Sequence, residues 1–180
     1  MEKYRDRLLE IIKTKALIFG ERKLASGRTS NYYIDGKMLT FDPEGLYIIG
    51  KIIFDMLKED QLQAIGGLAL GAVPIVSAVA VISFIEGRPL KTFAVRADKK
   101  DHGTEKQLEG YLETGWSVAI IDDVVTTGGS SFKAIQVAEA KGAIIKKVIA
   151  VVDRLEGARE FFLEKNYRFD SIFTKEDLGI

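Results

Sequence analysis

Hydrophobic residues recur along the first third of the chain at helical spacing. Over residues 3–14 they lie three or four positions apart among charged side chains, which predicts an amphipathic helix. The same spacing over residues 43–58 predicts a second helix. Asp42 and Pro43 stand at its start, where a carboxylate N-cap and a proline in the first turn are both favourable.

From residue 59 onwards, apolar strand-like segments alternate with helical ones. These segments show little polar alternation, as expected for a parallel sheet that is covered on both faces. The chain is therefore expected to form a doubly wound α/β fold with a mostly parallel sheet, and ligands are expected outside the carboxyl ends of the strands. After two short extended stretches, at 17–24 and 32–35, the predicted strands cover residues 64–70, 90–95, 117–121, 145–152 and 169–173, and the predicted helices cover 74–85, 130–141 and 157–165.

The length and composition of the chain fit one domain, residues 1–180. A chain of 180 residues buries enough surface to build a core without metal or disulfide staples. The absence of cysteine excludes disulfides, thiolate zinc sites and cysteine nucleophiles. A formal net charge of zero argues against non-specific nucleic-acid binding. The charged residues 1–7 lack the apolar core of a signal peptide, so a cytoplasmic location is expected.

One uncharged stretch, residues 61–85, has the length of a membrane span. Gly66, Gly67, Gly71 and Pro74 interrupt it, and the glycines would weaken a single continuous helix. A strand, a glycine-rich turn and a buried helix are therefore preferred to a membrane-spanning segment, and no membrane partner is expected.

Two aspartates and a glycine-rich turn form the sharpest local pattern. Asp122 and Asp123 follow an apolar strand, and small residues then lead into a helix. Glycines allow close backbone approach, hydroxyls donate hydrogen bonds and a helix N-terminus attracts anions, so the turn predicts a phosphate site, although it can also be only a tight connection. Two adjacent carboxylates at such a strand end repel each other and lose solvation, which costs free energy unless hydroxyl donors or cations interact with them. A phosphorylated sugar with its magnesium supplies both. The chain has no G-x-x-x-x-G-K-[ST] motif, and a Rossmann fingerprint would place its acid after the glycines.

A run of mixed charge, residues 96–106, follows another predicted strand. Such a run is most often a solvated loop. It lies on the predicted ligand side, however, and contains His102, the one histidine of the chain. Its cations are alternatively suited to close over an anionic leaving group and to neutralise charge as it develops.

Residues 120–131 resemble the 5-phosphoribosyl-1-pyrophosphate (PRPP) motif of type I phosphoribosyltransferases. Four further segments, in the expected order along nearly the whole chain, resemble orotate phosphoribosyltransferases in particular. They are Phe19 and Gly20 with Ser26, Gly27, Arg28, Ser30, Tyr32 and Tyr33; residues 67–74; Val95 and Arg96 with Lys100, Asp101, His102 and Gly103; and Asp153 with Arg154.

The resemblance implies a type I phosphoribosyltransferase fold with a small N-terminal hood, about residues 1–40. It implies transfer of ribose 5-phosphate from PRPP to orotate, giving orotidine 5′-monophosphate and pyrophosphate in UMP synthesis. Mg²⁺ is the implied cofactor, bound mainly through substrate oxygens and water, so no dedicated metal ligand is expected. The family also implies a homodimer in which the mobile loop acts in the neighbouring subunit's site.

The resemblance further assigns roles residue by residue. It implies that the pyrophosphate of PRPP is bound by Arg96, Lys100 and His102, and that the ribose hydroxyls are bound by Asp122 and Asp123. The expected catalytic residues are therefore Lys100, His102, Asp122 and Asp123. The rest of the PRPP site comprises Val124, Val125, Thr126, Thr127, Gly128, Gly129 and Ser130. The orotate contacts fall to Thr126, Arg154, Tyr32 and Tyr33, and an arginine can pair in a forked way with the carboxylate that distinguishes orotate from uracil.

Three positions depart from the family pattern. Some members carry lysine where this chain has Ala25, Gly71 and Ala97. The loss of these cations is expected to affect the rate of the reaction more than the type of reaction. Lys23 or Lys99 could replace them. Two other functions stay open at this point: a phosphoribosyltransferase for another base, and a non-catalytic PRPP-binding regulator that binds nucleic acid through a basic surface.

Overall fold

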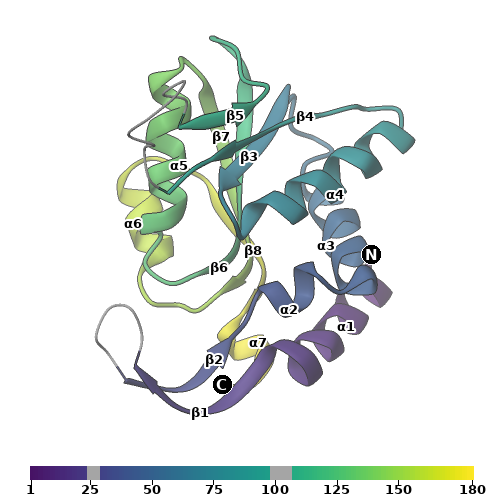
Figure 1. Ribbon diagram of the computed structural model, residues 1–180, viewed down its shortest axis with the longest axis vertical. Helices are drawn as coiled ribbons and strands as arrows, with labels where there is room; N and C mark the ends of the chain where they lie inside the picture. Colours follow the sequence, from purple (N-terminus) through teal and green to yellow (C-terminus); the bar gives the residue numbers. More distant parts are fainter. Residues whose placement is uncertain (24–28, 98–106) are drawn as a thin grey trace.

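A six-stranded sheet forms the centre of the computed structural model, which describes residues 1–23, 29–97 and 107–180 (Figure 1). The strand order is β5-β4-β3-β6-β7-β8, and every neighbouring pair is parallel except β4 with β5. The strands are β3 (Ala64–Leu68), β4 (Lys91–Val95), β5 (Leu108–Gly110), β6 (Ser117–Val125), β7 (Ile144–Asp153) and β8 (Phe169–Thr174).

Helices cover both faces of this sheet, which confirms the predicted doubly wound fold. α3 (Pro43–Met56) and α4 (Ala72–Ile85) lie on one face, and α5 (Gly129–Ala140) and α6 (Ala158–Glu164) on the other (Figure 1). The predicted cap of α3 is present, because the Asp42 carboxylate accepts a hydrogen bond from the Gly45 N–H at 2.8 Å.

The alternation of side chains along β6 divides the core in two. Ala119 and Ile121 point into the cluster beneath α3 and α4, whereas Val118 and Ile120 point into the cluster beneath α5 and α6. Successive residues of a strand face opposite sides of a sheet, so this pattern predicts that the next two side chains, Asp122 and Asp123, also face opposite sides. Buried apolar residues thus lie on both faces of the sheet, which explains why the predicted strands read as continuous apolar runs.

The N-terminal segment forms a separate layer against the sheet. It contains α1 (Glu2–Ile11), a π-helical turn (Ile12–Ala16), an antiparallel hairpin of β1 (Leu17–Lys23) and β2 (Thr29–Ile34), and α2 (Lys37–Thr40). Buried residues of this layer, among them Leu8, Ile12 and Leu39, belong to the same core cluster as Ile121. The layer occupies the position expected for a hood, while the division of the chain at about residue 40 stays a prediction.

Several element boundaries differ from the sequence-based expectation. The largest difference is in β6, which was expected to end at residue 121 but continues to Val125, because Val124 and Val125 still pair with Val152 and Asp153 of β7. The two aspartates therefore lie inside the strand. The first helix ends at Ile11 and widens into the π-helical turn. Three short elements, α2, β5 and α7 (Lys175–Leu178), had no sequence signal long enough to predict.

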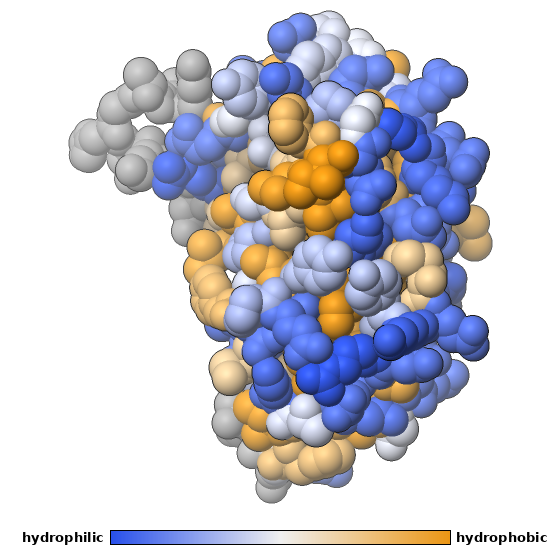
Figure 2. All heavy atoms as spheres, turned by 90° about the vertical axis from the view of Figure 1, so that its right-hand side faces the viewer, coloured by the Kyte–Doolittle hydropathy of each residue, from blue (hydrophilic) through white to orange (hydrophobic). Residues whose placement is uncertain are grey.

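The membrane-spanning alternative finds no support in α4. This helix has 14 residues, and none of the helices in the described part of the chain combines the length and apolarity that a bilayer span requires. α4 is nevertheless apolar on all sides, and Val81, Phe84 and Ile85 are exposed at its end. Figure 2, which views the side of α3 and α4, shows apolar surface on this face.

Gly67 tests the packing of β3 against β6. A Cβ atom on this residue would lie 2.1 Å from the Ile121 carbonyl oxygen and 2.6 Å from the Ala72 Cβ atom. Gly67→Ala is expected to lower the free energy of unfolding by about 1–3 kcal/mol, because the clash involves backbone that cannot rotate away. Denaturant unfolding measures this change. Gly129→Ala, where the added atom meets only the Thr127 hydroxyl at 3.9 Å, is the matched control, and an equal loss in both variants would contradict the packing argument.

Candidate active site

The candidate site lies where the strand order reverses. From β3 the chain crosses through α4 to β4 on one side, and from β6 it crosses through α5 to β7 on the other. The loops that follow β3 and β6 therefore diverge, and a crevice forms between them at the carboxyl ends of the strands. This is the edge at which the sequence places its candidate residues.

Asp122 faces α5 and is almost completely buried. Its carboxylate accepts a hydrogen bond from the Ser131 hydroxyl at 2.6 Å and another from the Asp123 N–H at 3.0 Å. Burial, and next the negative charge of Asp123, raise the pKa of Asp122 to about 7. These carboxylates thus repel each other as the sequence suggested, although strand alternation points them to opposite faces.

Asp123 faces the hood and is held between two glycines. A Cβ atom on Gly36 would lie 2.3 Å from its Oδ2 atom, and one on Gly71 would lie 2.7 Å from its Oδ1 atom. The Val124 N–H donates to Oδ1 at 2.9 Å. Gly36 belongs to the hood and Gly71 to the start of α4, so three separate segments meet at this half-buried carboxylate. The peptide between Ala69 and Leu70, in the loop before Gly71, is cis.

A cavity of about 190 Å³ lies between β6 and α5. Gly128 caps α5 with a φ of 86°, a conformation that favours glycine, and a Cβ atom on this residue would lie 3.0 Å from the rings of Phe161 and Phe162. The first turn of a helix leaves N–H groups for an anion, so the cavity has the chemistry of a phosphate cradle. Its lining residues are Asp122, Val124, Val125, Thr126, Thr127, Gly128, Gly129 and Ser130.

Arg154 joins the site from the end of β7. Its N–H donates to the Val125 carbonyl at 2.9 Å, so its backbone is fixed beside the cradle. The guanidinium is 5% exposed, lies 4.7 Å from the centre of the Tyr32 ring and pairs with Glu156 at 2.9 Å. A buried, forked donor beside an aromatic face is suited to a planar ligand that carries a carboxylate.

The remaining predicted residues are less closely grouped. Tyr33 follows Tyr32 in β2 and so points to the opposite side of the hairpin, close enough to Lys37 that its phenolate charge helps to raise the pKa of that lysine, after the larger effect of Asp35. Arg96 follows β4 and donates two hydrogen bonds to Glu109, at 3.0 and 3.1 Å. Lys100 and His102 lie outside the described residues.

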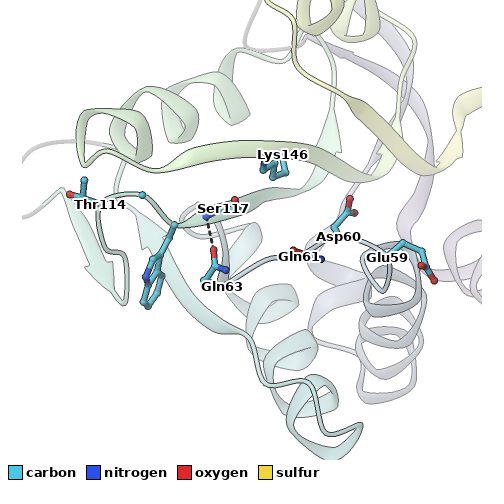
Figure 3. Close-up of a pocket in the computed structure, with 9 residues that line it drawn as sticks. Glu59, Asp60, Gln61, Gln63, Thr114, Ser117 and Lys146 are labelled. Carbon is cyan, nitrogen blue, oxygen red and sulfur yellow. Dashed lines mark hydrogen bonds between the residues drawn. The ribbon is translucent and has the colours of Figure 1, made fainter.

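A larger hollow, of about 670 Å³, lies at the opposite edge of the sheet (Figure 3). It is open and polar, and the Gln63 side chain in it accepts a hydrogen bond from the Ser117 N–H at 2.7 Å. Its lining residues precede β3 and β6 or lie near the start of β7, so it is remote from Asp122 and Asp123. Size alone is therefore a poor guide to the site in this fold, because the chemistry gathers at the carboxyl edge.

Three residues of the site were missed by sequence reasoning. Ser131 lies in the first turn of α5, directly after the predicted phosphate turn, and its contact with Asp122 follows only once Asp122 is known to face α5. Gly36 gives no local signal, because its partner Asp123 is distant in the chain. Glu156 lies two residues after Arg154, a spacing that alone does not predict contact.

The doubly wound sheet, the buried acidic strand and the helix-capped cradle together define a phosphoribosyltransferase of type I fold. The chain is 43% identical to the orotate phosphoribosyltransferase of Aquifex aeolicus, with 97% of each chain covered, and 42% identical to that of Nostoc sp., with 97% of this chain and 84% of the relative covered. The chain therefore belongs to the orotate phosphoribosyltransferase family. No family model matches it.

Solved structures agree with this assignment. The Mycobacterium tuberculosis orotate phosphoribosyltransferase in complex with PRPP has a TM-score of 0.83 at 30% identity, with 98% of this chain and 99% of that chain covered. The Aeropyrum pernix orotate phosphoribosyltransferase has a TM-score of 0.80 at 30% identity, with 95% of each chain covered. The adenine phosphoribosyltransferase of Leishmania donovani, at 16% identity and a TM-score of 0.68, over 94% of this chain and 80% of that chain, shares the fold.

Asp122 is expected to make stability depend on pH. Its folded pKa, about 7, is higher than the ordinary 3.8, so the folded protein binds this proton more tightly than the unfolded chain does. The resulting stabilisation is complete below the ordinary pKa and is lost as the pH rises through about 7. The free energy of unfolding should therefore fall between about pH 4 and about pH 7 more steeply in the native protein than in Asp122→Asn. Equal slopes in denaturant unfolding would show that Asp122 is ionised throughout.

Proposed function

We propose that this protein transfers the ribose 5-phosphate of PRPP to orotate, giving orotidine 5′-monophosphate and pyrophosphate, a step of UMP synthesis. The observation that carries this proposal is the meeting of three groups at one crevice: the acidic strand of Asp122 and Asp123, the phosphate-sized cavity before α5, and the buried guanidinium of Arg154. Together they match the two ends of the sugar phosphate and the carboxylate of the base.

The cradle and the aspartates would hold the sugar. Donors from residues 126–130 would bind the 5′-phosphate at the N-terminus of α5. Asp123, half-buried and immobilised by Gly36 and Gly71, would accept hydrogen bonds from the ribose hydroxyls. As the anomeric carbon loses pyrophosphate, positive charge develops on the ring, and a preorganised carboxylate nearby favours that charge. Asp122 would support this arrangement from the α5 side through Ser131.

Arg154 would select the base. Its guanidinium can take a carboxylate in a forked pair, which orotate offers and uracil lacks. A site built for such a pair discriminates against a ligand without the carboxylate, because the charge-assisted hydrogen bonds to that carboxylate are then not formed. Tyr32 would contact the planar ring from the hood side, and Thr126 would contact it from the cradle. We also assign Tyr33 to orotate, which requires its side chain to leave the opposite side of the hairpin, where it now points.

The pyrophosphate leaving group is negatively charged, so cations are needed to stabilise it. We assign Arg96, Lys100 and His102 to the pyrophosphate of PRPP. Arg96 is 43% exposed and its partner Glu109 is 54% exposed, so exchange of this surface ion pair for a phosphate oxygen has a small cost. Lys100 and His102 complete the set from the loop that follows.

Mg²⁺ fits the donor set without a dedicated protein cage. In the described part of the chain, no three acidic or histidine side chains gather in a metal-binding cluster, while Asp123 offers an accessible carboxylate beside the cradle. Mg²⁺ retains water and favours phosphate oxygens, so PRPP would carry most of its ligands and Asp123 would lie near it. When bound, the ion would neutralise charge on the pyrophosphate.

A homodimer is part of the proposal. α4 lies at the surface but carries only two polar side chains, Ser77 and Ser83, and exposes Val81, Phe84 and Ile85. A helix that is apolar on all sides is normally buried, so a second copy of the chain is a suitable cover for this face. We propose that the loop containing Lys100 then acts in the partner's site. A cytoplasmic location stays a prediction.

A direct assay tests the reaction. Purified protein with PRPP and Mg²⁺ is supplied with orotate, uracil, adenine or hypoxanthine, and the nucleotide product is identified by chromatography. Orotidine 5′-monophosphate from orotate alone is expected, and chelation of Mg²⁺ should suppress it. Transfer to another base would overturn the assignment of orotate, and PRPP binding without any product would favour a regulator.

Asp123→Asn is expected to lower kcat by about two orders of magnitude, the scale on which one preorganised electrostatic group acts. The amide keeps the shape between Gly36 and Gly71 but loses the charge. Steady-state kinetics measure the effect. Asp6→Asn, on the exposed side of α1, is the matched control and should retain native kcat. Native turnover in Asp123→Asn would remove this carboxylate from the mechanism.

Mixed dimers test the action of the loop in trans. Lys100→Ala alone is expected to slow the chemical step in single-turnover experiments, and Asp123→Asn alone is expected to be impaired as above. After the two variants are unfolded and refolded together, half of the dimers are mixed, and each mixed dimer has one complete site if the loop acts in trans. Activity should recover to roughly a quarter of the native value. No recovery over the sum of the single variants would indicate a loop that serves its own subunit.

A further inference from the structure

The hood brings a lysine to the Asp123 carboxylate. Gly36 approaches this carboxylate closely, since a Cβ atom on it would lie 2.3 Å from Oδ2, and Lys37 follows as the first residue of α2. α2 lies at the carboxyl edge of the sheet (Figure 1). Lys37 therefore starts from backbone beside the acid that we propose to bind the ribose hydroxyls, although the two residues are remote in sequence.

The Lys37 ammonium has a local partner that it can exchange. Its Nζ atom lies 3.0 Å from Asp35 Oδ1, an oxygen that also accepts a hydrogen bond from the Lys37 N–H at 3.2 Å. The Lys37 side chain is 49% exposed and that of Asp35 24% exposed. Water competes with such a pair, so its exchange for a phosphate oxygen has a small cost.

Three nearby groups raise the pKa of Lys37. Asp35 has the largest effect and Tyr33 the next, while Asp123 contributes a smaller one through its charge. The ammonium therefore stays charged at neutral pH and lies within the electrostatic reach of Asp123. This agrees with the close approach of Gly36, and both observations place the cation at the sugar side of the crevice.

We propose that Lys37 is a further catalytic residue, whose ammonium contacts the pyrophosphate of PRPP from the hood side of the crevice. The inference rests on the proposed function, which gives the ribose hydroxyls to Asp123. In PRPP the pyrophosphate is bonded to the anomeric carbon, next to the carbon that carries the 2-hydroxyl. A cation on a flexible stem beside Asp123 is therefore within reach of a pyrophosphate oxygen.

The role of this cation is electrostatic. The bond between the anomeric carbon and pyrophosphate breaks, and its electron pair leaves on the pyrophosphate oxygen. A nitrogen of orotate forms the new bond to carbon, while the proton of that nitrogen goes to solvent. Negative charge on the leaving group grows in the transition state, so the ammonium interacts with it more strongly there than in the ground state. Lys37 keeps its proton throughout.

The packing around Asp123 explains why this cation comes from the hood. Some members of the family carry lysine at position 71, but here a Cβ atom on Gly71 would lie 2.7 Å from Asp123 Oδ1. Gly36 approaches the other oxygen, and Lys37 is the residue after it, so its charge reaches this acid without a side chain in the space that Gly36 and Gly71 leave open. In this proposal Lys37 substitutes for the charge that is missing at position 71.

Lys37→Ala tests the proposal by kinetics and by binding. We expect kcat to fall about tenfold, because one cation is lost from the leaving group. The Kd of inorganic pyrophosphate, measured by calorimetry in the presence of Mg²⁺, should rise about tenfold as well. The KM for orotate should stay within about twofold. Lys37→Arg keeps the positive charge and should recover most of both losses.

Two control variants separate this role from a structural one. Asp35→Asn breaks the same ion pair but keeps the Lys37 ammonium, and its amide oxygen can still accept the Lys37 N–H. This variant should retain native kcat and native affinity for pyrophosphate. Lys13→Ala removes an exposed lysine elsewhere in the hood and should also leave both quantities unchanged.

Each outcome has a defined meaning. Native kcat or native pyrophosphate affinity in Lys37→Ala would overturn the proposal, as would an arginine variant as impaired as the alanine variant. Equal losses in Lys37→Ala and Asp35→Asn would also overturn it, since Lys37 would then act only as the partner of Asp35. A native protein that makes no orotidine 5′-monophosphate would instead overturn the proposed function, while pyrophosphate binding would still report on Lys37, so the two failures are distinguishable.

Discussion

The side-chain alternation along β6 is the constraint on which the site depends. Because neighbouring residues of a strand face opposite sides, Asp122 enters the layer of α5 and Asp123 enters the layer of the hood and α4. One strand thereby connects the phosphate side of the crevice with its sugar side. The buried member of the pair has a raised pKa and a hydroxyl partner, while the half-buried member is free to meet a ligand. Two adjacent residues of one type acquire different chemistry from their surroundings alone.

The hood contributes residues to the site that contact the side chains at the strand ends. Gly36 limits the space around Asp123, and Tyr32 covers Arg154, so both ends of the crevice depend on a layer that is remote in sequence from the strands. The shared core explains how this layer keeps its place, since Leu8, Ile12 and Leu39 pack in the same cluster as Ile121. A close-packed interior transmits small displacements, so the hood is part of the site and not only a cover for it.

Much of this architecture follows from sequence pattern, and the exceptions have physical causes. The apolar runs predict the parallel sheet and its helices, because burial on both faces leaves no polar alternation. The predicted end of β6 was wrong by four residues, because polar side chains suggest a strand end even where pairing with β7 continues. The phosphate turn was found from its glycines and hydroxyls. By contrast, the contacts of Gly36 with Asp123 and of Glu156 with Arg154 depend on tertiary arrangement and on a left-handed turn at Leu155, which no local pattern announces.

The close packing of Asp123 against Gly36 and Gly71 also limits which substitutions this sequence can accept. Some members of the family carry lysine at the position of Gly71, but here any side chain at that position would collide with the Asp123 carboxylate. Gain of the lysine would require the acid to shift, and Gly36 blocks the shift toward the hood. Positions 36, 71 and 123 are thus expected to be epistatically linked, and a lysine at position 71 would require concerted change in two layers of the protein.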